Sequence, residues 1–95
     1  MVKYSAALLM ETPVKEIVGT GKKAEERGYS IIWIPDERFN KNPYVILSAL
    51  ATNTNHITLA TGVTNPYTRN PVFTAAAIAS VDDLSNGRAL LGLGA

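Results

Sequence analysis

The sequence predicts an α/β fold with parallel strands, in the order βαβαβαβ, on three observations. Four short, continuously apolar runs alternate with three longer segments of helical pattern, which is typical of strands buried on both faces of a parallel sheet. The three helical segments all open on a polar residue followed by proline, at Pro13, Pro43 and Pro71. No low-complexity linker interrupts residues 1–95. We therefore expect a single domain of repeated βα units joined by right-handed crossovers.

The first unit joins the apolar run 4–10 to a helix that we expect to start at Thr12-Pro13. A capping side chain there precedes a proline at the first helical position, where the missing N–H costs nothing. Gly28 marks the end of this helix, because glycine is favoured in a left-handed C-terminal cap. The second unit repeats the device, with an apolar run at 30–35 and a helix start at Asn42-Pro43.

The third unit consists of the run 57–63, a helix that starts at Asn70-Pro71 and a glycine-containing end at residues 85–87. The run 89–94 is expected to add a fourth strand. We expect the third helix to be covered on more than one side, because little of its surface is polar. Its main apolar face comprises Phe73, Ala77, Val81 and Leu84.

Composition and charge argue against several classes of function. Nine basic and eight acidic residues give a net charge of +1 without a basic stripe, so no nucleic-acid partner is expected. Cysteine is absent and His56 is the single histidine, so we expect neither disulfides nor a metal site. No apolar run approaches the roughly 20 residues that span a bilayer, and no signal-peptide pattern is present. We expect a cytoplasmic protein without a membrane partner.

The candidate ligand site follows the strands, because ligands of parallel α/β folds bind beyond the carboxyl ends. Asp36 and Glu37 come directly after the second apolar run. They could accept hydrogen bonds from a ligand or exchange a proton. The alternative is a solvated turn in which they pair with Arg38.

Residues 61–71 lead from the third strand to the third helix through a polar loop. Gly62 permits close backbone approach, while Thr64 and Asn65 carry hydroxyl and amide groups suited to the polar edge of a planar ring. The alternative is a tight loop whose polar side chains satisfy their own backbone.

Three further features favour structural roles. Arg69 could meet an anionic ligand, but we expect it to have a structural carboxylate partner such as Asp82 or Asp83. His56 precedes the third strand and should lie at the opposite edge of the sheet from the ligand site. The segment 92–94 reads Gly-Leu-Gly without a third glycine, so a dinucleotide fingerprint is not supported.

Residues 53–55, 61–71, 75–80 and 82–94 together resemble the luciferase-like flavin and deazaflavin oxidoreductases. The greatest likeness is to the coenzyme F420-dependent branch that includes methylenetetrahydromethanopterin reductase. These enzymes are (β/α)8 TIM barrels, which need roughly 250 residues. The resemblance implies that residues 1–95 are the N-terminal part of such a barrel, its first three βα units plus the fourth strand.

The resemblance also implies site residues. Asp36 would touch the deazaflavin, and a non-proline cis peptide at Gly62-Val63 would back its ring. Together with Thr64 and Asn65, chosen above for their polar groups, these residues are the predicted cofactor contacts. Many relatives have histidine where this chain has Glu37, so proton transfer would fall to Glu37 beside Asp36. The implied cofactor is F420, with FMN as the alternative, and the implied chemistry is hydride exchange with a small-molecule substrate.

The leading functional hypothesis is therefore the N-terminal part of an F420- or flavin-dependent oxidoreductase, inactive as an isolated segment. The alternative is a stand-alone half-barrel that self-associates without catalytic activity. A homo-oligomer is expected in both cases, because an open parallel sheet leaves unpaired edge strands. A flavodoxin-like nucleotide module ranks last, because residues 10–13 lack a phosphate loop.

Overall fold

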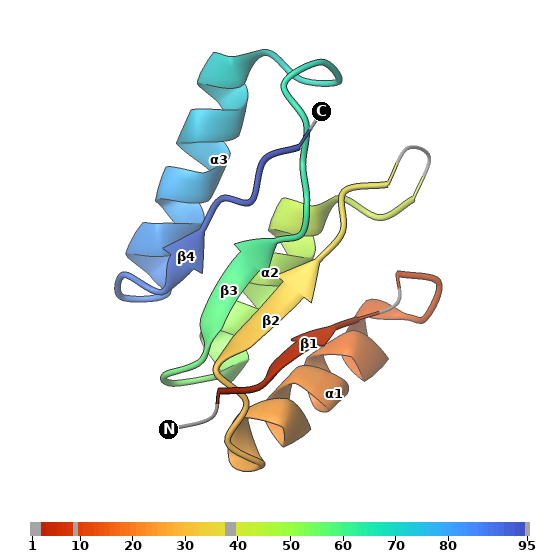
Figure 1. Ribbon diagram of the computed structural model, residues 1–95, viewed down its shortest axis with the longest axis vertical. Coiled ribbons are helices and arrows are strands. Elements are labelled where there is room, and N and C mark those ends of the chain that lie inside the picture. Colours follow the sequence, from red (N-terminus) through yellow and green to blue (C-terminus); the bar gives the residue numbers. More distant parts are fainter. Residues whose placement is uncertain (1–2, 9, 38–39, 95) are drawn as a thin grey trace.

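The computed structural model describes residues 3–8, 10–37 and 40–94. Its elements follow the predicted βαβαβαβ order, and the strands form one parallel sheet in the order β1-β2-β3-β4 (Figure 1). The α/β prediction is confirmed. The elements are β1 (Ser5–Ala7), α1 (Val14–Glu26), β2 (Ile31–Ile34), α2 (Pro43–Asn53), β3 (Thr58–Thr61), α3 (Pro71–Leu84) and β4 (Ala89–Leu90).

The strands are shorter than the apolar runs that predicted them. β1 covers only Ser5–Ala7 of the run 4–10, yet Leu8 and Met10 beyond it are buried. The apolar run therefore predicts which residues are buried, and burial continues past the last residue assigned to the strand. Pairing also resumes past β3, where Thr64 forms an isolated parallel bridge with Leu93.

The hydrophobic core lies between the sheet and the helices, which pack on one of its faces (Figure 1). In β2, Ile32 and Ile34 are fully buried, whereas the alternate residues Ile31 and Trp33 are only half-buried. The prediction that the strands are buried on both faces is therefore wrong for β2, because helices cover only one side of it. The centre of the core comprises Ile17, Ile32, Ile34, Ile46, Leu47, Leu50, Ile57 and Leu59.

Two of the three predicted helix starts are confirmed. The Asn42 and Asn70 side chains each accept the backbone N–H two residues on, at 2.9 Å, and a proline follows each of them. The first start is displaced by one residue, because Pro13 itself occupies the N-cap position and α1 begins at Val14. The extended ψ of 148° at Pro13 places its ring before the first turn.

The predicted helix ends are confirmed, since Gly28 and Gly87 have positive φ angles of 83° and 84°. The predicted cover of α3 is not found. Only Thr74 and Val81 of this helix are buried, and Phe73 is 70% exposed. In the described part of the chain α3 packs mainly against α2 and β4, and Phe73 and Leu84 of its predicted apolar face stay exposed.

Candidate functional site

A part-buried ion pair forms at the carboxyl edge of the sheet. Asp36 follows β2, while Thr64 and Arg69 come from the segment between β3 and α3. The Thr64 hydroxyl donates to Asp36 Oδ2 at 2.6 Å, Arg69 Nη2 donates to Oδ1 at 3.2 Å, and Arg69 Nη1 donates to Oδ2. The Asp36 side chain is only 7% exposed. Arg69 thus has a structural carboxylate partner as predicted, but that partner is Asp36, and the suggestion of Asp82 or Asp83 was wrong.

The parallel register explains this meeting. Ile34 at the end of β2 is aligned with Thr61 at the end of β3, and the Gly62 N–H donates to the Ile34 carbonyl at 2.8 Å. Because adjacent parallel strands end at the same edge, the residues that follow them come together. The sequence alone suggested a partner for Arg69 in α3, because its contact with Asp36 forms only when β2 and β3 lie side by side.

The ion pair keeps Asp36 ionised. Burial by itself raises the pKa of this carboxyl, but the hydrogen bonds from Arg69 and Thr64 and the charge of Arg69 outweigh it, and the pKa lies below its usual value. The hydrogen bond to Asp36 in turn raises the pKa of Arg69. Both groups are therefore charged at neutral pH.

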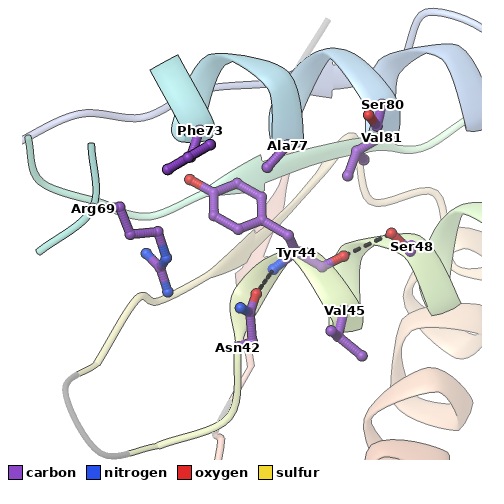
Figure 2. A pocket seen from close by; sticks show the side chains of 9 residues that line it. All are labelled: Asn42, Tyr44, Val45, Ser48, Arg69, Phe73, Ala77, Ser80 and Val81. Atoms are coloured by element: carbon purple, nitrogen blue, oxygen red, sulfur yellow. Dashed lines mark hydrogen bonds between the residues drawn. The ribbon is translucent and has the colours of Figure 1, made fainter. Parts of the chain in front are cut away.

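Arg69 also lines a groove between α2 and α3 (Figure 2). Its Cζ atom lies 5.3 Å from the centroid of the Tyr44 ring, within cation–π range. Tyr44 belongs to the first turn of α2 and is 8% exposed, and its buried hydroxyl has no hydrogen-bond partner within the described residues. The groove has a volume of about 490 Å³ and is lined by Asn42, Tyr44, Val45, Ser48, Arg69, Phe73, Ala77, Ser80 and Val81.

The segment after β3 contains the expected cis peptide bond between Gly62 and Val63. Gly62 lies against Trp33, since a Cβ atom at Gly62 would come within 2.9 Å of the indole side chain. Past the cis bond, the Thr64 N–H donates to the Gly92 carbonyl at 2.9 Å and the Thr64 carbonyl accepts from Gly94 N–H at 2.8 Å. The Val63 side chain is left 52% exposed.

Two other predicted site residues, Asn65 and Glu37, lie in different surroundings from each other. The Asn65 side-chain oxygen accepts the backbone N–H groups of Tyr67 and Thr68, both at 2.9 Å. For this side chain the structure shows the tight loop that was the alternative interpretation. Glu37 is exposed at the same edge as Asp36, and its alternative partner Arg38 lies outside the described residues.

A second hydrogen-bonded carboxylate lies at the opposite edge of the sheet, where the strands begin. Glu25, near the end of α1, accepts the backbone N–H groups of Asn55, His56 and Ile57 at 2.8 to 3.1 Å. Burial raises the pKa of Glu25, but these hydrogen bonds outweigh it and the pKa is lowered. His56 lies at this edge as predicted, with Nδ1 3.5 Å from Glu25 Oε2 and its side chain 71% exposed.

Two basic side chains that connect elements of the fold were not predicted from the sequence. Lys41 Nζ donates to the Met10 carbonyl at 2.8 Å, which joins the start of α2 to the chain after β1. The Arg88 guanidinium donates five hydrogen bonds to oxygens at the end of α2 and beyond. The available signal for Arg88 was a lone arginine directly before an apolar strand.

Within the described ranges, no three His, Cys, Asp or Glu side chains gather as metal ligands. No helix in these ranges is both long and apolar enough to cross a bilayer.

Parallel βα units in the sequential strand order β1-β2-β3-β4, with a polar cluster after the strands, match the arrangement of βα barrels, in which ligands bind at the carboxyl ends of the strands. Residues 2–95 match the family described as luciferase-like monooxygenase, and the chain belongs to this family. It is 51% identical over 82 residues to 5,10-methylenetetrahydromethanopterin reductase of Methanolobus tindarius, covering 86% of this chain and 25% of that protein. The Archaeoglobus fulgidus reductase is 47% identical over 94 residues, covering 99% and 28% respectively.

Solved structures agree with this assignment. The coenzyme F420-dependent tetrahydromethanopterin reductase of Methanopyrus kandleri superposes with a TM-score of 0.95 at 39% identity, over 98% of this chain and 27% of that one. The oxygenating constituent of 3,6-diketocamphane monooxygenase from Pseudomonas putida, in complex with FMN, shares the fold with a TM-score of 0.85 at 18% identity, over 98% and 29%. The chain thus spans about a quarter of the length of these relatives and corresponds to the N-terminal part of a TIM barrel.

Proposed function

We propose that the chain is the N-terminal part of a deazaflavin- or flavin-dependent oxidoreductase that exchanges hydride with a small-molecule substrate. The observation that carries this proposal is the likeness to the F420-dependent reductase of Methanopyrus kandleri, with a TM-score of 0.95 at 39% identity. F420 is the preferred cofactor for that reason. FMN is the alternative, because the FMN-bound relative shares only the fold.

The residues present fit one face of a planar ring. Val63 offers an exposed apolar side chain at the carboxyl edge, 52% accessible, and an apolar surface with a polar rim is typical of cofactor sites. The adjacent Gly94 keeps this surface open, since a Cβ atom there would lie 2.8 Å from Val63 Cγ2. We propose that Gly62, Val63 and Thr64 form the wall behind the ring, with Asn65 at its rim.

The acidic pair at this edge would supply the polar chemistry. When bound, the deazaflavin or flavin supplies the hydride transfer, and the protein binds, orients and excludes water. We propose that Asp36 faces the cofactor as a carboxylate fixed in its ion pair with Arg69, and that Glu37, which is exposed, exchanges protons with the bound ligands.

We further propose a cytoplasmic homo-oligomer, because a diffusible cofactor and substrate must reach the site and the sheet has open edges.

Cofactor titration of the complete polypeptide that carries residues 1–95 tests the proposal. We expect saturation at micromolar F420 or FMN, followed by absorbance, and at least tenfold weaker binding for Val63→Asp, which places a charge against the ring. Val72→Asp is the matched control, because Val72 is 71% exposed in the first turn of α3 and is not one of the residues proposed for the wall. Binding of neither cofactor, or equal binding by both variants, would contradict the proposal.

A self-associating half-barrel without catalysis is the second candidate. The observation that favours it is the strand order β1-β2-β3-β4, which leaves β1 and β4 with one unpaired edge each. Binding of F420 or FMN separates the two candidates.

A further inference from the structure

We propose that Arg69 is a positioning residue that locks Asp36 against the wall behind the cofactor and leaves Glu37 alone to exchange protons. The inference rests on the proposed function for the identity of the cofactor. Arg69 acts through Asp36 and Thr64 and does not itself touch the reacting atoms. Of these two adjacent carboxylates, Asp36 is therefore held in place by Arg69, and Glu37 is left to exchange protons.

The first step is that both oxygens of the Asp36 carboxylate accept hydrogen bonds. Oδ1 accepts from Arg69, and Oδ2 accepts from both Arg69 and the Thr64 hydroxyl. A bidentate arginine fixes the plane of a carboxylate as well as its charge. Asp36 therefore cannot turn its carboxylate without breaking contacts to two other residues.

The second step leads from Asp36 to the wall. Thr64 is fully buried and forms backbone hydrogen bonds on both sides, to the Gly92 carbonyl and from the Gly94 N–H. Its hydroxyl then joins this paired backbone to Asp36 at 2.6 Å. The ion pair with Arg69 consequently fixes the residue next to Val63, whose exposed side chain faces the proposed ring.

The third step concerns Arg69 itself. Its guanidinium lies over the Tyr44 ring on α2 (Figure 2). Its side chain is 28% exposed, and two of its nitrogens donate hydrogen bonds to Asp36. A neutralised pair offers little net charge to an anionic ligand. Arg69 therefore serves as a link between α2, the end of β2 and the loop before α3.

The fourth step is the contrast with Glu37. Asp36 is almost completely buried and held ionised, whereas Glu37 is exposed to solvent. A group that exchanges protons has to be reachable and free to change its charge. Of this acidic pair, only Glu37 meets that condition.

The experiment follows the Asp36 carboxyl by NMR in the complete polypeptide, with carboxyl-labelled aspartate and Asp36→Asn to identify the resonance. Three proteins are compared: the unchanged chain, Arg69→Met, and the control Arg27→Met, which alters an exposed arginine at the end of α1. We expect Arg69→Met to raise the pKa of Asp36 and to make the Thr64 and Asn65 amide shifts follow its titration. Neither change is expected in Arg27→Met.

Cofactor affinity supplies the second readout. Arg69→Met should weaken F420 binding about tenfold, increasingly so at acid pH as Asp36 takes up a proton, and should have no further effect in the Asp36→Asn background. Additive losses in the double variant would mean that Arg69 meets the ligand directly and would overturn the proposal. An unchanged Asp36 titration in Arg69→Met would do the same.

The two proposals can fail separately. If the unchanged protein binds neither F420 nor FMN, the proposed function is contradicted, while the ligand-free NMR titration still decides whether Arg69 positions Asp36 and Thr64.

Discussion

Arg88 shows how much of the structure can depend on one side chain. Its guanidinium has five N–H groups, and each donates to an oxygen of the protein. The acceptors include the carbonyls of Ala51 and Thr54, which belong to the end of α2 where helical carbonyls lack intrahelical partners. Arg88 thereby joins the end of α2, the start of β3 and the turn before β4.

Arg88→Met should therefore lower the free energy of unfolding by roughly 2 to 4 kcal/mol, because several part-buried carbonyls lose their donor. Arg88→Lys, with three donors on one nitrogen, should recover only part of this loss. Urea denaturation followed by circular dichroism measures both. Arg27→Met is the control, and a loss as large as that of Arg88→Met would show that the effect is not specific to the hydrogen bonds.

The two carboxylates with lowered pKa values predict the acid response. A carboxyl group whose pKa is lower in the folded than in the unfolded protein binds fewer protons when folded, so its stabilisation is complete above the unfolded value. Glu25 and Asp36 start from usual values of 4.5 and 3.8. Stability should accordingly fall as the pH drops below about 4.5, through the folded pKa values.

Glu25→Gln and Asp36→Asn test this expectation. Each variant should show a smaller dependence of stability on pH than the unchanged chain between about pH 5 and 2, because the titrating group is gone. Urea midpoints measured across this range are the readout. Identical slopes in all three proteins would place the acid sensitivity on other groups.

The residue level is also where sequence reasoning was weakest. The strand-end position of Asp36 could be predicted from the apolar run before it, but its partner Arg69 could not. The two are 33 positions apart and meet only because β2 and β3 are adjacent and parallel. Asp82 and Asp83 lie in the last turn of α3, whereas Arg69 precedes its first turn, so the length of the helix keeps them apart.

At the scale of elements, α1 and α2 approach closely where α1 has a glycine. A Cβ atom at Gly21 would lie 2.3 Å from Leu50 Cδ2 and 3.3 Å from Ile32 Cδ1. Two positions earlier, a Cβ atom at Gly19 would meet nothing within 4 Å. One helix thus contains two glycines, of which only Gly21 is required for packing.

Opposite effects of alanine at these positions are the test. Gly19→Ala should stabilise the protein by about 0.5 to 1 kcal/mol, because alanine loses less backbone entropy in a helix. Gly21→Ala should destabilise it by about 1 to 3 kcal/mol, because the core must shift to admit the methyl group. Thermal unfolding of the two variants compares them directly, and stabilisation by both would mean that Leu50 gives way without cost.

Helix starts were predicted better than strand lengths, for a physical reason. An asparagine cap before proline is a local device that acts within a few residues, and it is found at Asn42 and Asn70. Strand ends depend on how far the neighbouring strand runs alongside. The run 89–94 therefore yields only Ala89–Leu90 as β4, with Leu93 recovered as a bridge to Thr64.

At the scale of the whole molecule, the sheet is open at β1 and β4. Exposed apolar side chains also gather in and after β4, where Leu90, Leu91 and Leu93 are 37 to 58% accessible. An unpaired strand edge next to apolar surface favours contact with another polypeptide. The TIM-barrel relatives, of which the chain covers about a quarter, are the corresponding complete folds.

The isolated chain of residues 1–95 should therefore associate. Sedimentation velocity should give a mass above 10.2 kDa that rises with concentration. Leu90→Lys, at the edge strand, should shift the distribution toward the monomer, whereas the control Val72→Lys on α3 should not. A monomer at all concentrations would contradict self-association through the sheet edge.

The strand order has a consequence for the order of events during translation. β2, β3 and β4 each pair with the strand made just before them, as in the register of Ser5 with Ile31 and of Ile31 with Thr58. Within the described sheet these three strands find a partner already synthesised, so the sheet can grow one βα unit at a time as the chain leaves the ribosome. The last strand completed then serves as the template on which the next one forms.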